Sequence, residues 1–239
     1  MCLLLLAVQK HPDYALVLAA NRDEYYDRPT APAAFWDEAP HLLAGKDLRA
    51  GGTWLGITKN GRIAAITNYR DPASIKTNAP SRGKLVSGFL LGQENAEHFL
   101  ERLAQEKDRY NGFNLIIGEN DQLYWFSNRG DGVRKLSPGV YGLSNRLLDT
   151  PWPKLTRSKE AMAHLISNEK IPSQDGLFQM LLDRTVADDE QLPDTGVGIE
   201  WERILSPIFI TSPTYGTRSS TVILIDRQDR VTFTEKTFN

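Results

Sequence analysis

The stretch MCLLLLAVQK, residues 1–10, decides the fold that the sequence predicts. Its apolar run is typical of a strand buried on both faces, and the HPD that follows leads into a second apolar run, YALVLAA. Together they predict an antiparallel hairpin, with one strand over residues 2–9 and the other over residues 14–20. Because the first run is short and no basic segment precedes it, we expect neither a signal peptide nor a membrane span.

The charge and the cysteine content narrow the class of protein. Lys and Arg number 28 against 30 Asp and Glu, so the net charge of -2 provides no field that would attract nucleic acid or an acidic membrane. The single cysteine cannot form an internal disulfide, and no Cys/His spacing suits structural zinc. We therefore expect a cytoplasmic protein that acts on a small molecule, with no metal or other cofactor. The sequence leaves its oligomeric state open.

The rest of the chain alternates groups of strands with pairs of helices. Asn60-Gly61 is a hairpin signal between two apolar runs, whereas Pro29, Pro32 and Pro40 predict an irregular surface loop over residues 25–42. The other expected strands cover residues 53–58, 62–67, 113–118, 122–127, 133–136, 221–225 and 230–234, and the expected helices cover residues 81–91, 95–107, 153–166 and 174–186. This order lacks β-α-β alternation and favours one α+β domain, residues 1–239, of antiparallel sheets covered by helices.

Cys2 has two interpretations. Cysteine behaves as a small apolar residue, so Cys2 could simply fill space in the first strand. Alternatively, an aminopeptidase removes Met1, and Cys2 then carries both a thiol and a free α-amine. An α-amine titrates near ~8 and can accept the thiol proton, so nucleophile and base would be parts of one residue.

Further candidate residues follow the apolar segments. Asn21, Arg22 and Asp23 begin the NRDE block, which is either a solvated strand end or a set of site residues. In the second case Asp23 would orient the α-ammonium, Arg22 would lower the pKa of the thiol, and Asn21 and Arg22 would contact substrate. Asn68 and Asn145 each end a strand segment, as surface turn residues or as donors to an oxyanion. Arg218 would order the site or bind a substrate carboxylate.

Several short motifs, taken in order, resemble one known family. They are MC at the start, NRDE at 21–24, GGTWLG at 51–56, TNYRDP at 67–72, PSRG at 80–83, GLSN at 142–145 followed by PWPK at 151–154, and YGTRSST at 215–221. This pattern, spread over nearly the whole chain, resembles the NRDE family, also called the transport and Golgi organisation protein two family. That family is similar to N-terminal-nucleophile hydrolases of the choloylglycine hydrolase and penicillin acylase group. The resemblance implies a four-layer αββα sandwich of two mainly antiparallel sheets.

The resemblance also implies roles for single residues. Cys2 would be the nucleophile and Asp23 its orienting carboxylate, Asn68 and Asn145 would hold the oxyanion, and Arg218 would be the late arginine of the site. One position departs from the acylases, which have an arginine three residues before the aspartate. Here that position is Ala20, and the arginine of the block, Arg22, is adjacent to Asp23.

Two functions follow from these residues. The first is an N-terminal cysteine amidohydrolase that cleaves the C–N bond of a small linear amide or acylated amine. The second is a non-enzymatic protein on the same fold that binds and traffics an acyl-lipid, an acyl-CoA or haem, because relatives in the NRDE family have been associated with lipid and haem handling. Removal of Met1 separates the two, since the hydrolase needs the free α-amine of Cys2.

Overall fold

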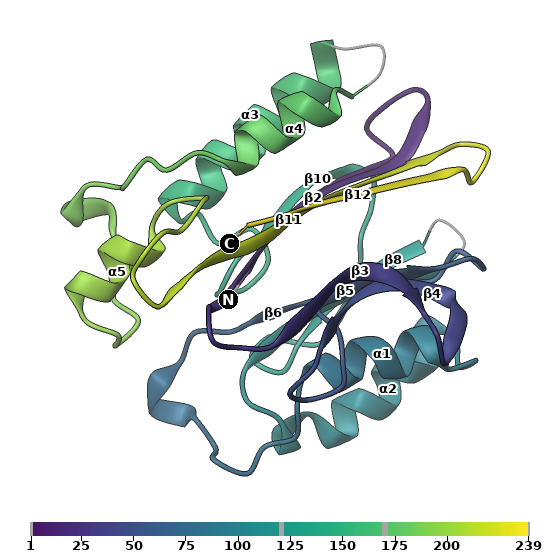
Figure 1. The fold of residues 1–239 in the computed structure, drawn as a ribbon, viewed down its shortest axis with the longest axis horizontal. Helices are drawn as coiled ribbons and strands as arrows, with labels where there is room; N and C mark the ends of the chain where they lie inside the picture. Colours follow the sequence, from purple (N-terminus) through teal and green to yellow (C-terminus); the bar gives the residue numbers. More distant parts are fainter. Residues whose placement is uncertain (1, 120–121, 169–171, 239) are drawn as a thin grey trace. The chain divides into compact units, whose positions relative to one another are not determined.

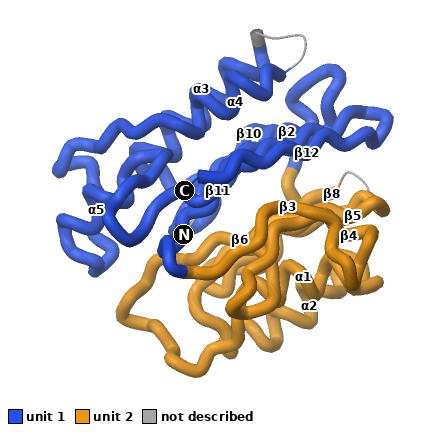
Figure 2. The backbone as a smooth tube through the Cα atoms, viewed as in Figure 1, with its two compact units in different colours: residues 1–27, 137–239 blue, residues 28–136 orange. Residues whose placement is uncertain are grey.

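The computed structural model describes residues 2–119, 122–168 and 172–238, and the chain forms two compact units. Unit 1 combines Met1–Asp27 with Ser137–Asn239, and unit 2 is Arg28–Leu136 (Figure 2). The first unit therefore contains both ends of the chain, and the second is an insertion between its second and third strands.

Unit 1 is built around a five-stranded antiparallel sheet in the order β10-β1-β2-β11-β12. These strands are β1 (Cys2–Val8), β2 (Tyr14–Tyr25), β10 (Gly139–Leu143), β11 (Tyr215–Asp226) and β12 (Val231–Thr237). The apolar run at the start of the chain forms β1, which is paired on both sides, and Leu3 to Val8 are buried. The hairpin predicted from residues 1–20 is thus confirmed.

Helices cover one face of this sheet (Figure 1). They are α3 (Pro153–Asn168) and α4 (Gln174–Leu181), while the shorter α5 (Ile199–Leu205) follows a 3-10 turn at Asp189–Gln191. Alternate residues of β1 and β2, including Leu3, Leu5 and Val17, form a core with Met162 and Phe178 of the helices. Apolar residues at every second position of the strands therefore pack against apolar residues at helical spacing in α3.

Unit 2 is a seven-stranded antiparallel sheet whose strands follow one another in chain order. They are β3 (Thr30–Trp36), β4 (Ala39–Asp47), β5 (Leu55–Thr58), β6 (Ile63–Asn68), β7 (Phe113–Glu119), β8 (Gln122–Ser127) and β9 (Val133–Lys135). Two helices, α1 (Gly83–Leu91) and α2 (Ala96–Glu106), pack on one face around Phe89, Phe99 and Phe113. Short 3-10 turns lie at Pro72–Ser74 and Lys107–Arg109.

These two sheets and their helices confirm the predicted α+β class, with some boundaries corrected. Asn95 caps α2 as expected, because its side chain accepts from the backbone N–H of His98. Ser81 was expected to cap α1, but the N-cap is Arg82 and no side chain caps it. The helix predicted to reach residue 186 ends at Leu181, and α5 is a helix that the sequence did not predict.

The prediction of an irregular loop over residues 25–42 is wrong, because β3 and the first part of β4 lie there. Pro32 is tolerated since β3 is an edge strand, where a missing backbone N–H need not break a ladder. The pairing with β4 also shifts between Ala31 and Ala34, around that proline. Proline density therefore indicated an edge strand and not a loop.

The NRDE block likewise differs from the expected strand end. β2 continues to Tyr25, so all four residues of the block belong to a strand that pairs with β11, and the first three pair with β1 or β11 in the buried part of the sheet. Asn21, Arg22 and Asp23 are buried. Three adjacent polar residues in the middle of a sheet require dedicated partners, and those partners build the site described below.

None of the helices in the described part of the chain is both long and apolar enough to cross a membrane.

Candidate functional site

Backbone register aligns several of the predicted residues across the sheet of unit 1. Cys2 pairs with Arg22 of β2, and Arg22 pairs with Ser219 of β11. On the other side of β1, Leu4 pairs with Leu143 of β10, and continuing this register by two residues places Asn145 level with Cys2. One row across the sheet therefore contains Cys2, Arg22 and Ser219, and Asn145 follows β10 at the same level of the extended register.

The hydroxyl of Ser219 adds a polar group to this row that the sequence did not single out. Ser219 is 4% exposed, and its Oγ has no hydrogen-bond partner among the described residues. Buried hydroxyl groups are normally hydrogen-bonded, so an unsatisfied one marks a place where a bound molecule could supply the partner.

A β-bulge shapes the end of the row. Asp23 pairs with Thr217 and Arg22 pairs with Ser219, so Arg218 is the extra residue of β11. The Arg218 Nη1 donates to the carbonyl of Tyr25 at 2.9 Å and to that of Tyr26 at 3.3 Å. Arg218 thus holds the chain that leaves the NRDE block, and its predicted role in the site stays a prediction.

Asp23 is the centre of a buried polar cluster. Its Oδ1 accepts a hydrogen bond from the Thr217 hydroxyl at 2.7 Å, and its carbonyl accepts one from the Tyr215 hydroxyl at 3.1 Å. Burial raises the pKa of Asp23, while the charge of Lys154, the Thr217 hydrogen bond and the charge of Arg22 act in the opposite direction. Asp23 is thus a carboxyl group whose charge depends on its neighbours.

Asn21 has surroundings of a different kind. Its Nδ2 donates to the carbonyls of Leu181 and Ile208, at 2.9 Å in both cases, and its Oδ1 accepts from Ser220 Oγ at 2.6 Å. Both amide hydrogens are therefore used to tie the end of α4 and the segment before β11 to the sheet. This arrangement favours a structural role for Asn21 over the substrate contact that the sequence suggested.

Asn145 follows β10 and is fully buried. Its Oδ1 accepts from the Ser144 hydroxyl at 3.3 Å. The loop behind it is fixed by Asp149, whose Oδ1 accepts from the Gly142 backbone N–H at 2.8 Å and from Lys159 Nζ at 2.6 Å. A buried amide on a fixed loop has the rigidity that an oxyanion donor needs.

Asn68 belongs to unit 2, where it is the last residue of β6 and pairs with Phe113 of β7. The next residue, Tyr69, donates its backbone N–H to the Gly112 carbonyl at 2.9 Å. Its predicted part in an oxyanion site stays a prediction.

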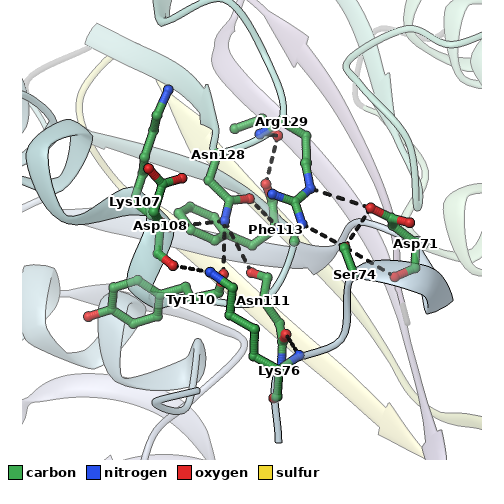
Figure 3. Close-up of polar contacts among 12 residues, drawn as sticks. Asp71, Ser74, Lys76, Lys107, Asp108, Tyr110, Asn111, Phe113, Asn128 and Arg129 are labelled. Carbon is green, nitrogen blue, oxygen red and sulfur yellow. Dashed lines mark hydrogen bonds and ion pairs between the residues drawn. The ribbon is translucent and has the colours of Figure 1, made fainter. Parts of the chain in front are cut away.

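Side chains from distant segments hold the loop that follows Asn68 (Figure 3). The Arg129 Nη2 donates to Ser74 Oγ at 2.6 Å, and its Nε lies 3.6 Å from Asp71 Oδ2. The Asn111 amide pairs with the backbone of Lys76, accepting its N–H at 2.7 Å and donating to its carbonyl at 3.0 Å. A loop with such contacts keeps a defined path.

The Asn128 side chain connects these segments (Figure 3). Its Oδ1 accepts from the backbone N–H of Phe113 at 2.9 Å. Its Nδ2 is within 3.2 Å of the Lys107 carbonyl and 3.3 Å of the carbonyls of Tyr110 and Asn111. One buried amide thus replaces regular backbone pairing for the turn between α2 and β7.

Lys154 is a buried charged residue of unit 1 that sequence reasoning missed. It is 3% exposed, and its Nζ donates to the Leu205 carbonyl at 2.8 Å. The PWPK motif contained it, but a lysine at a helix start gives no sign of burial.

Within the described residues, no group of three or more His, Cys, Asp or Glu side chains is arranged to hold a metal ion.

The match to a known family covers the whole chain. The family model described as Transport and Golgi organisation 2 matches residues 1–239. The chain belongs to this family. The Transport and Golgi organization protein 2 homolog of Bos taurus is 40% identical to it, over 93% of this chain and 86% of that protein.

Two solved structures share the fold at low sequence identity. A Caenorhabditis elegans N-acylethanolamine-hydrolyzing acid amidase ortholog has a TM-score of 0.53 and 11% identity, over 93% of this chain and 92% of that chain. The C2A mutant of conjugated bile acid hydrolase from Clostridium perfringens has a TM-score of 0.53 and 9% identity, over 100% and 97%. The chain therefore shares the fold of these two proteins, as the resemblance implied.

Proposed function

We propose that the protein is an N-terminal cysteine amidohydrolase whose nucleophile is Cys2 after removal of Met1. The register of the sheet is the observation that carries this proposal. It pairs Cys2 with Arg22, Asp23 follows Arg22 along β2, and the register of β1 with β10, continued two residues past the Leu4–Leu143 pair, reaches Asn145. These are the charges and the amide that acyl transfer from a cysteine requires.

The proposed reaction has two halves. The α-amine of Cys2 takes the thiol proton, and the thiolate attacks the carbonyl carbon of an amide. The tetrahedral oxyanion receives hydrogen bonds from the Asn145 amide, and Asn68 is the second donor expected from the sequence. When the C–N bond breaks, the α-ammonium returns its proton to the departing amine and a thioester remains. Water then attacks the thioester, which releases a carboxylic acid and restores the thiol.

The neighbouring charges explain how the α-amine keeps its place. Asp23, when ionised, accepts hydrogen bonds from the α-ammonium and fixes its direction. Arg22, directly across from Cys2 in the backbone pairing, is in this proposal the positive charge that favours the thiolate. Ser219 offers a hydroxyl group in the same row for a polar group of the substrate.

The substrate of this proposal is a small linear amide or acylated amine in the cytoplasm. One structural neighbour is named for hydrolysis of N-acylethanolamines, which are acylated amines, and another for hydrolysis of conjugated bile acids. The second is a C2A mutant, in which a cysteine at position 2 is replaced by alanine. These names support the chemistry proposed for Cys2.

Three measurements on the purified protein test the proposal. Intact mass shows whether Met1 is removed. Because Cys2 is the only cysteine in the chain, the rate of alkylation by iodoacetamide reports on this thiol alone. Turnover of a panel of fatty-acyl and short-chain amides, for the protein and its Cys2→Ser variant, then reports on catalysis. We expect the mature chain to begin at Cys2, rapid alkylation near neutral pH, and turnover that the variant loses.

The alternative function gives a different set of results. Retention of Met1 would refute the hydrolase, since Cys2 would then have no free α-amine. Rapid alkylation without turnover of any amide favours a protein that binds an acyl-lipid, an acyl-CoA or haem on the same fold. Direct binding of palmitoyl-CoA and of haemin, followed by fluorescence and absorbance, would identify that second function.

A further inference from the structure

The start of α3 carries a lysine that is almost completely buried. Lys154 is 3% exposed, although lysine is one of the residues least often buried. Its Nζ is fixed by a hydrogen bond of 2.8 Å to the Leu205 carbonyl. A neutral carbonyl does not balance a buried positive charge, so such a lysine is stable when a carboxylate lies nearby.

The segment 205–210 joins this lysine to the Asp23 cluster. Its first residue accepts from Lys154, the Ile208 carbonyl accepts from Asn21, and the Ile210 N–H donates to Thr217 Oγ1 at 2.9 Å. Thr217 in turn donates to Asp23. These contacts place the start of α3, the segment 205–210 and the NRDE strand in one buried polar cluster.

Charge connects the two ends of the cluster. Burial raises the pKa of Asp23, and Lys154 is the strongest of the influences that lower it, ahead of Arg22. Glu202 of α5 is the other buried carboxylate near the Leu205 end, and it accepts hydrogen bonds from the backbone N–H and the hydroxyl of Thr195. Asp23 is thus a buried acid on which the charge of Lys154 acts.

We propose that Lys154 is a positioning residue of the site, whose buried ammonium, held on the Leu205 carbonyl, keeps Asp23 ionised so that Asp23 can orient the α-ammonium of Cys2. The consequence for Cys2 rests on the proposed hydrolase function. The effect on Asp23 does not, because it follows from burial and charge alone.

The experiment measures the titration of the Asp23 carboxyl directly. Protein labelled with carbon-13 in its aspartates is titrated by NMR, and the Asp23→Asn variant identifies the Asp23 signal. The test variants are Lys154→Met, which removes the charge, Lys154→Gln, which also keeps a donor for the Leu205 carbonyl, and Lys154→Arg, which retains the charge. Lys159→Met is the matched control, because Lys159 lies on the same helix and pairs with Asp149 at 2.6 Å.

We expect the Asp23 midpoint to move to higher pH in Lys154→Met and Lys154→Gln, to return toward the wild-type value in Lys154→Arg, and to stay unchanged in Lys159→Met. If Lys154→Met does not fold, Lys154→Gln decides the question. A midpoint in the folded Lys154→Gln variant that equals that of Lys159→Met would overturn the proposal, because a lysine that only ties α3 to α5 would leave the titration of Asp23 unchanged.

The pH profile of Cys2 alkylation by iodoacetamide tests the link to the nucleophile in the same variants. The proposal requires this profile to shift together with the Asp23 midpoint. A shift of the Asp23 midpoint without any change in the alkylation profile overturns the link. If both shift while the wild-type protein hydrolyses no amide, the hydrolase function fails and the role of Lys154 beside Asp23 stands.

Discussion

Thr217 and Asp23 are cross-strand partners on β11 and β2, and the Thr217 hydroxyl donates to Asp23 Oδ1 over 2.7 Å. The oxygen of the same hydroxyl accepts from the backbone N–H of Ile210 at 2.9 Å. Thr217 thus connects the only buried carboxylate of the NRDE block to the segment that Asn21 and Lys154 also hold. Loss of this one hydroxyl group would therefore remove two hydrogen bonds of the cluster at once.

Replacing Thr217 by valine tests this connection. The change keeps the branched shape but removes both hydrogen bonds, so the Ile210 N–H loses its acceptor inside the protein. We expect the free energy of unfolding to fall by about 1–3 kcal/mol. Urea unfolding followed by circular dichroism measures it. Thr232→Val on β12, where the side chain is exposed, is the control and should change stability by less than about 0.5 kcal/mol.

Asp23→Asn should separate stability from activity. The pKa of Asp23 is raised by burial above its usual 3.8, so the folded state retains the proton at pH values where the unfolded chain has lost it. The contribution of Asp23 to stability is therefore present below the unfolded pKa and is lost as pH rises through the folded one. We expect the variant to be more stable than wild type at neutral pH, with a difference that shrinks on acidification, and to lose amide turnover.

Thermal unfolding of the two proteins between pH 3 and neutral pH measures this difference. The comparison is informative because asparagine still accepts the Thr217 hydrogen bond, so only the charge changes. A variant that is less stable than wild type at every pH would mean that the ionised carboxylate stabilises the fold on balance.

Much of this architecture could be predicted from the sequence, because local signals agreed with the final packing. The apolar runs of β1 and β2 and the Asn95 cap of α2 are examples in which one short segment fixes its own structure. The order of strands and helices likewise favoured antiparallel sheets. The paired residues Cys2 and Arg22 followed from the same hairpin, once the strand was known to continue through the NRDE block.

Other features depend on partners that are distant in the sequence. Asn21 looked like a residue for substrate, but its amide bonds to Leu181 and Ile208, more than a hundred positions away. Lys154 is buried against the end of α5, where it donates to the Leu205 carbonyl, and α5 was not predicted because its sequence is rich in charged residues. Pro32 indicated a loop because local preference cannot show that its strand has a neighbour on one side only. In each case tertiary contacts overrode a correct local preference.

Asn128→Ala tests the polar cluster of unit 2. The amide satisfies the Phe113 N–H and carbonyls of the turn between α2 and β7, and all of these lose a partner together. We expect a loss of about 2–4 kcal/mol in the free energy of unfolding, from several hydrogen bonds of a buried group. Asn78→Ala, at an exposed position of the loop after β6, is the control. Equal stability of the two variants in urea would show that water replaces the Asn128 amide without cost.

Tyr124 gives the protein a dependence on alkaline pH. The Tyr124 hydroxyl oxygen lies within hydrogen-bonding distance of two acceptors, Glu97 Oε1 at 2.8 Å and Gln122 Oε1 at 2.9 Å. Burial and the Glu97 hydrogen bond raise the pKa of Tyr124 from 10.0 to about 12. The neutral hydroxyl is favoured in the folded state, so its contribution to stability is complete below the unfolded pKa and is lost between pH 10 and about 12.

Tyr124→Phe should therefore be less stable than wild type near neutral pH by about 1 kcal/mol, and the difference should close as the pH rises through that window. Urea unfolding at a series of pH values measures it, and Tyr25→Phe, whose ring is half exposed on β2, is the control. A difference that widens with pH would contradict the direction of the shift.

Asn145→Ala addresses the proposed chemistry most directly. Asn145 is fully buried and continues the register of β10 to the level of Cys2, and its proposed role is to stabilise charge that develops only in the transition state. Loss of one such donor costs about 100- to 1,000-fold in kcat, with little change in KM, because the substrate binds before the oxyanion forms. Steady-state kinetics on the amide found by the substrate panel measures both constants.

Ser144→Ala is the control, since it removes only the hydroxyl that donates to Asn145 Oδ1, and we expect it to lower kcat by less than about tenfold. If Asn145→Ala raised KM and left kcat unchanged, Asn145 would bind the ground state and the oxyanion would have to be held by other donors.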